Sequence, residues 1–188
     1  MTYEEMIRNI GPKDLRKSVY YSQALFFIIA ILLSVTLFRK QINWLSMFTL
    51  NLSEILLLGF LTACVVVGFE LILFRYIPRK YMDDGGINEK IFTGVTIKQV
   101  FMIALIVAIA EELLFRGVIQ TVFGYVIASS VFVLLHYRYI KKIVLFGLLV
   151  CISFFIGYLF KITNNLFVTI MFHFTVDFLL GIYISYRK

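Results

Sequence analysis

Charged and imidazole side chains interrupt several long apolar runs of the sequence, and these are the residues that could do chemistry. They are Glu70, Glu111, Glu112, Arg116, His136, His173 and Asp177. A charge placed in hydrocarbon costs several kcal/mol unless it is paired or faces a cavity, so such residues are functional candidates by default. Carboxylates and imidazoles together can move protons to and from a water molecule or a substrate.

Spacing separates the roles of the two adjacent glutamates. Glu112 and Arg116 are four residues apart, so on a helix they share a face and can form an ion pair. Glu111 is rotated by about 100° from Glu112, onto a different face. We therefore expect Glu111 to be the freer carboxylate and to take and return protons. The alternative is a structural role, in which Glu111, Glu112 and Arg116 form a cluster that joins neighbouring helices. His173 and Asp177 are also four apart, so the carboxylate can orient the imidazole or share a ligand with it.

A turn at Gly124 would bring these groups together. Glu111 and His136 lie about equally far from this turn along the chain, so both would be roughly 18 Å below it at 1.5 Å per residue. His173 enters from the same side and would lie roughly 12 Å deep. Because Arg138 follows His136 so closely, this helix should end in a water-filled recess, which predicts a site that opens towards the cytoplasm.

Two further residues have simpler interpretations. Phe132 precedes His136 by four residues and is expected to pack against it. Glu70 lies near the end of its apolar run beside Arg75, so we expect it to snorkel and pair locally.

Composition identifies the setting of these residues as a membrane. Of 188 residues, 61% are hydrophobic and only 15% are charged, with a mean hydropathy of +0.94. Too few polar residues are present to cover the surface of a soluble protein. The net charge of +7 falls in short clusters between apolar segments, which is typical of cytoplasmic loops and does not suggest nucleic-acid binding.

The apolar segments predict an all-α, polytopic transmembrane helical bundle with about six membrane segments. They are residues 18–38, 55–74, 99–123, 125–137, 143–160 and 166–185. Residues 125–137 are too few to cross a ~30 Å core alone. Residues 75–98 form the one long polar loop, with a turn at Asp83-Asp84-Gly85-Gly86 and room for a short interfacial helix. The distribution of Lys and Arg places both termini and this loop in the cytoplasm.

Three motifs in order carry a resemblance to a known family. Glu111-Glu112-x-x-x-Arg116, Phe132-x-x-x-His136 and His173-x-x-x-Asp177 together resemble the motifs of the CAAX protease and bacteriocin-processing (CPBP) family of intramembrane endopeptidases. The similarity covers about residues 98–177. It divides the chain into an N-terminal two-helix membrane region with a cytoplasmic loop, residues 1–98, and a catalytic membrane core, residues 99–188.

The resemblance implies roles for the motif residues. Glu111 and His136 would activate water, while His173 and Asp177 would stabilise the oxyanion, with Glu112, Arg116 and Phe132 in support. The last family motif often ends in Asn, so Asp177 is a departure, and it keeps a zinc site of His136, His173 and Glu111 open as an alternative. Because no His-Glu-x-x-His helix is present, a metal-free site without cofactor is favoured.

The sequence therefore predicts an intramembrane endopeptidase that uses glutamate-activated water. Its partners would be the lipid bilayer and a membrane-associated protein or peptide substrate, with or without a lipid anchor, and its location a bacterial plasma membrane that it crosses several times. The alternative is a non-catalytic membrane partner, such as a bacteriocin self-immunity protein or a regulatory scaffold, that retains the family core. A proton-coupled transporter is less favoured, because no internal repeat or pair of broken helices is evident.

Overall fold

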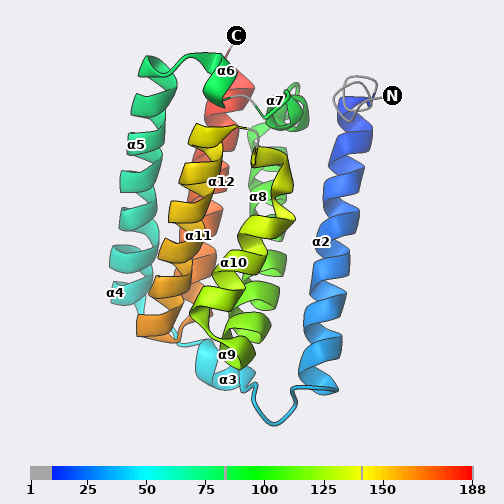
Figure 1. The fold of residues 1–188 in the computed structure, drawn as a ribbon, viewed down its shortest axis with the longest axis vertical. Coiled ribbons are helices and arrows are strands. Elements are labelled where there is room, and N and C mark those ends of the chain that lie inside the picture. The colour runs from blue at the N-terminus through cyan, green and yellow to red at the C-terminus, as the bar shows by residue number, and fades with distance from the viewer. Residues whose placement is uncertain (1–9, 83, 141, 188) are drawn as a thin grey trace.

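The computed structural model describes residues 10–82, 84–140 and 142–187, and every regular element in this part of the chain is a helix (Figure 1). The predicted all-α bundle is thereby confirmed. The first charged residues of the N-terminus, Asp83 of the predicted turn and Lys141 of the basic loop at 138–142 lie outside the described residues.

In the part of the chain that the structure describes, four helices are long and apolar enough to cross a membrane. They are α2 (Pro12–Val35), the continuous helix Leu52–Tyr76, α11 (Ile143–Thr163) and α12 (Leu166–Tyr186). Helix Leu52–Tyr76 consists of α4 (Leu52–Glu54), a π-helical stretch η1 (Ile55–Leu61) and α5 (Thr62–Tyr76). Large apolar side chains such as Leu25, Phe27 and Leu57 are exposed on these helices. Because hydrocarbon accepts such a surface and water does not, the fold is that of a multi-pass membrane protein.

Of the two remaining segments, the one that carries the glutamates includes the most deeply buried part of the bundle, whereas the other exposes residues such as Ile127 and Leu134. One helix runs from α8 (Ile97–Glu112) through a second π-helical stretch, η2 (Leu113–Gln120), into α9 (Thr121–Phe123), and α10 (Tyr125–Leu135) follows. Thr96 and Gln99 form a capping box that fixes the start of α8, with each side chain accepting a hydrogen bond from the other residue's backbone N–H. Helices α2, α10 and α12 all pack on this inner helix.

Gly124 makes the predicted turn between α9 and α10. Its φ of 87° lies in the region that favours glycine, and it lets the chain reverse within one residue. Figure 1 shows α9 and α3 (Trp44–Met47) at one end of the bundle, and the start of α2 and the end of α12 at the other. His136 directly follows α10 and is therefore carried back towards the end that holds the termini.

Helices α10 and α11 approach closely at small residues. Ser129 Oγ donates to the Ser153 carbonyl at 3.2 Å, and Ser153 Oγ donates to the Ser129 carbonyl at 3.0 Å. A Cβ atom added to Gly157 would lie 2.6 Å from Ser129 Oγ. Small residues and reciprocal hydrogen bonds of this kind hold helices together where the hydrophobic effect between them is absent.

The boundaries differ from the prediction mainly at the ends that leave the membrane. Helix α2 begins at Pro12 and ends at Val35, and the second membrane helix begins at Leu52. The loop at 75–98 holds two short helices, α6 (Arg79–Met82) and α7 (Ile87–Phe92), and η3 (Tyr137–Tyr139) follows α10. Hydropathy locates the apolar part of a helix but not the residue at which the helix begins or ends, so shifts of a few residues are expected.

Candidate active site

A cavity of about 510 Å³ lies between the membrane helices and contains most of the predicted site. Glu111, His136, His173 and Asp177 all line it. Its wall also includes Arg138 and other residues of the connections at the end of the bundle that holds the termini. The structure therefore brings the four residues from three helices into one space with a route to that end.

Glu112 lies next to this cavity in a fully buried network. The ion pair expected from its spacing is present, with Arg116 Nε 3.5 Å from Glu112 Oε2 and neither side chain exposed. Arg116 also donates through Nη2 to the Ser153 carbonyl at 3.1 Å, and its guanidinium lies over the Phe132 ring. Glu112 thus joins α8 indirectly to α10 and α11.

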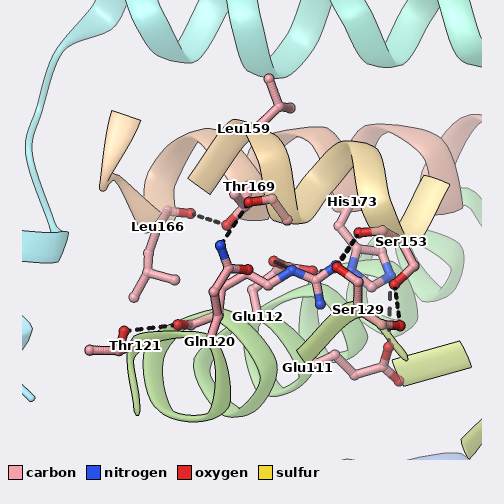
Figure 2. Close-up of polar contacts among 12 residues, drawn as sticks. Glu111, Glu112, Gln120, Thr121, Ser129, Ser153, Leu159, Leu166, Thr169 and His173 are labelled. Atoms are coloured by element: carbon pink, nitrogen blue, oxygen red, sulfur yellow. Dashed lines mark hydrogen bonds and ion pairs between the residues drawn. The ribbon is translucent and has the colours of Figure 1, made fainter. Parts of the chain in front are cut away.

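Glu112 has a second partner that sequence reasoning missed. Its Oε1 lies 2.9 Å from His173 Nδ1, and Figure 2 shows Glu112 among polar side chains from other helices, with Glu111 to one side. Because a carboxylate can only accept, Nδ1 must carry the hydrogen in this contact. Glu112 therefore fixes the orientation of the His173 ring as well as that of Arg116, and leaves Nε2 towards the other carboxylates.

Glu111 faces the cavity and is held by a residue from the first helix. Gln23 Nε2 donates to Glu111 Oε1 at 3.0 Å, and the other oxygen, Oε2, lies 3.9 Å from His173 Nε2. A water molecule about 2.8 Å from both atoms would subtend an angle of about 90°, which its hydrogen-bonding geometry allows. Gln23 was not predicted as a site residue, although an amide within the first apolar run was a visible signal.

His173 is surrounded by three carboxylates. Besides Glu112 and Glu111, Asp177 Oδ2 lies 3.5 Å from His173 Nε2, as the spacing of four residues on α12 predicts. Asp177 is the most open of the three, with 34% of its side chain exposed. It is therefore the carboxylate of this group that solvent or substrate can reach most readily.

His136 is positioned by Phe132. The two rings stack with centroids 4.6 Å apart, and His136 Nδ1 lies 2.9 Å from the Phe132 carbonyl oxygen. Because that oxygen can only accept, Nδ1 carries the hydrogen and Nε2 is the ring nitrogen left for other partners. The Phe132 ring also meets the His173 ring edge-on, with centroids 6.2 Å apart, so it contacts both imidazoles. No direct hydrogen bond joins His136 to Glu111, and their pairing stays a prediction.

Glu70 does not behave as its position in the sequence suggested. Its side chain does not snorkel to pair with Arg75; Glu70 is only 6% exposed and lines the cavity, whereas Arg75 is exposed. The reason is the packing of α5 on α12, seen in the stacking of Phe74 on Tyr183 at 5.8 Å. This contact turns the Glu70 face of α5 towards the interior.

The helix that carries both glutamates changes its winding directly after them. The π-helical stretch η2 begins at Leu113 and includes Arg116. Such wide turns inside α-helices are found frequently at functional sites. A sequence pattern that assumes 3.6 residues per turn cannot reveal this change of winding.

The donor groups were also compared with the arrangement that a metal ion needs. Within residues 10–82, 84–140 and 142–187, no group of three or more His, Cys, Asp or Glu side chains has that arrangement. The metal-free site and the zinc alternative of His136, His173 and Glu111 both stay predictions.

Comparison with known proteins identifies the family. A sequence model described as type II CAAX prenyl endopeptidase Rce1-like matches residues 93–179. The uncharacterized protein YpbD of Bacillus subtilis (strain 168) is 35% identical over 156 residues, which are 83% of this chain and 82% of that protein. The chain belongs to the Rce1-like family. The Rce1-like match contains all three motifs, from Glu111 to Asp177, and supports a CAAX-type intramembrane protease at the level of the family. No solved structure was found to match the chain.

Proposed function

We propose that this protein is a glutamic-type intramembrane endopeptidase, which hydrolyses a peptide bond of a membrane-associated protein or peptide. The observation that carries the proposal is the placement of Glu111. One of its oxygens is fixed by Gln23, and the other faces His173 Nε2 in a cavity that His136 and Asp177 also line. A nearly buried carboxylate with one committed and one available oxygen is suited to act as a general base.

In the proposed reaction, Glu111 takes a proton from water while the water oxygen attacks the peptide carbonyl carbon. The carbonyl oxygen becomes an oxyanion, and the C–N bond then breaks as Glu111 returns the proton to the leaving nitrogen. His136 Nε2 accepts the second hydrogen of the water and so orients it. General-base help of this kind contributes about 10²–10⁴-fold to the rate.

His173 would supply the charge that stabilises the oxyanion. In its imidazolium form it donates through Nδ1 to Glu112 and presents a second N–H, at Nε2, to the cavity. Loss of one donor to an oxyanion typically costs about 10²–10³-fold in kcat. In the absence of substrate, Asp177 accepts a hydrogen bond from His173 Nε2 and orients the ring. A carboxylate can fill this role, although the last family motif more often has Asn at this position.

The proposed site needs no metal or other cofactor. The Nδ1 atoms of His173 and His136 are already engaged by Glu112 and by the Phe132 carbonyl, and the chain supplies a base and an oxyanion donor by itself. We further propose that the protein acts in a bacterial plasma membrane. The distribution of Lys and Arg supports a cavity that is reached from the cytoplasm, by a substrate with or without a lipid anchor.

The proposal is tested by Glu111→Gln, which keeps the shape of the side chain and removes the base. Cells that express the wild type, Glu111→Gln or the exposed control Glu89→Gln are compared by mass spectrometry of new peptide termini in the membrane fraction. We expect a set of termini that the wild type and Glu89→Gln produce and Glu111→Gln does not, at equal protein levels. An unchanged set, together with an unchanged phenotype, would favour the non-catalytic membrane partner.

A further inference from the structure

Glu70 has no role in the proposed reaction, yet it lies in the same cavity. It is on α5, whose sequence lies outside the three motifs and outside the matched residues 93–179. The side chain is 6% exposed, and its Oε2 atom has no hydrogen-bond partner among the described residues. A buried carboxyl group without a partner is costly, so its retention calls for a ligand or a compensating charge.

Among the described residues, the basic groups around the cavity are engaged elsewhere. His136 is held at Nδ1 by the Phe132 carbonyl, and its Nε2 is assigned to the attacking water in the proposed reaction. Arg116 pairs with Glu112. His173 is bonded to Glu112 through Nδ1 and faces Asp177 and Glu111 through Nε2. Arg138 lies 3.9 Å from Asp84 and donates to Tyr139 Oη at 2.7 Å. Of the carboxylates that line the cavity, Glu70 is the one without an ion pair to any basic side chain that the structure describes.

The surroundings of Glu70 indicate what kind of cation would fit. Asp177, on the neighbouring α12, lines the same cavity as Glu70, so this cavity holds carboxylates from two adjacent helices. The walls beside them are apolar and include Phe74, Leu148 and Leu180. A Lys or Arg side chain combines an apolar stem with a charged end and matches such a wall with carboxylates at its end.

We propose that Glu70, together with Asp177, forms a subsite for a Lys or Arg side chain of the substrate, close to the bond that is cut. This inference rests on the proposed function and adds a substrate preference to it. Glu70 is then a specificity-determining residue that binds substrate and takes no part in proton transfer. The free protein keeps an unpaired carboxyl group, and the substrate supplies its counter-charge.

The test uses palmitoylated decapeptides that carry either Lys or norleucine, its uncharged analogue, at one position at a time. Wild type, Glu70→Gln and the control Glu89→Gln are reconstituted in liposomes, and kcat/KM is measured for each peptide pair. At one position we expect a preference for Lys of about tenfold or more, since truncating one partner of a buried charge pair weakens binding at least that much. Glu70→Gln should reduce this preference to near unity, whereas Glu89→Gln and Glu70→Asp should keep most of it.

Two results would overturn the subsite. One is a ratio of kcat/KM for the Lys peptide to kcat/KM for the norleucine peptide that is the same in the wild type and in Glu70→Gln. This includes the case in which neither protein prefers Lys. The other is a thermal midpoint of Glu70→Gln well below that of the wild type. Loss of a purely structural carboxyl group would destabilise the protein without substrate, whereas loss of a substrate-binding carboxyl group would not.

A separate binding measurement distinguishes failure of the subsite from failure of the protease proposal. Glu111→Gln protein is titrated with the same fluorescently labelled peptide pairs, and its affinities are compared with those of the double variant Glu111→Gln/Glu70→Gln. If the wild type cut no peptide, the proposed reaction would be wrong, but a Lys preference that depends on Glu70 would still support the subsite. If cleavage occurred and binding showed no such dependence, only the subsite would be wrong.

Discussion

Gln23 offers a test of how the first membrane helix contributes to the site. It donates to Glu111 Oε1 at 3.0 Å, and its own Oε1 has no partner among the described residues. Gln23→Met keeps the length and shape of the side chain but cannot donate. The variant removes the bond that sets which Glu111 oxygen faces the cavity.

The size of the effect follows from the strength of that bond. A hydrogen bond to a charged group contributes about 1.5–3 kcal/mol. If the rate is proportional to the fraction of molecules with Glu111 correctly oriented, kcat should fall by about 10- to 150-fold, at 1.4 kcal/mol for each factor of ten. The thermal midpoint should change little, because the substitution leaves Glu111 Oε1 without a donor but also removes the unpartnered Oε1 of Gln23.

The assay is cleavage of one substrate peptide by purified protein in liposomes, with kcat and KM determined separately. Gln41→Met is the matched control, because Gln41 is exposed and does not line the cavity. We expect a fall in kcat with little change in KM for Gln23→Met, and wild-type kinetics for Gln41→Met. A Gln23→Met protein that is correctly folded and cuts at the wild-type rate would refute a positioning role for Gln23.

Three further predictions concern the network and the chemistry. Glu112→Gln should lower the free energy of unfolding by about 3–5 kcal/mol, because it leaves Arg116 buried without its carboxylate. Chemical denaturation in micelles measures this free energy, and a change below about 1 kcal/mol would contradict the assigned pairing. Gly157→Ala should cost about 1–3 kcal/mol in the same assay, because the added Cβ would meet Ser129 Oγ, and a variant as stable as the wild type would show that α10 and α11 have room to separate. Treatment with 1,10-phenanthroline should leave cleavage unchanged, whereas a loss of activity that zinc restores would contradict the metal-free mechanism.

Much of the fold could be predicted from the sequence because the membrane imposes simple rules. Apolar runs of sufficient length located the spanning helices, and Gly124 marked the turn that returns His136 towards the other end. Pairs spaced by four residues, Glu112 with Arg116 and His173 with Asp177, are in contact as a helix requires. These features depend on local geometry, which a single sequence contains.

The remaining features of the site depend on contacts between helices, which local spacing does not contain. The bonds from Gln23 to Glu111 and from Glu112 to His173 join residues 88 and 61 positions apart. The inward position of Glu70 follows from how α5 packs on α12, and proximity to Arg75 in the sequence pointed the other way. The positions of polar residues in apolar runs were visible, but their partners were not.

The most direct test of the central claim compares purified wild type and Glu111→Gln in liposomes. Both proteins are given the same peptide, one that the wild type cuts, and their thermal midpoints are measured to show that both are equally folded. We predict that the rate of product formation falls by at least about 10²-fold, the lower end of what a general base contributes. An equal rate in the two proteins would contradict the assignment of Glu111 as the base that activates water.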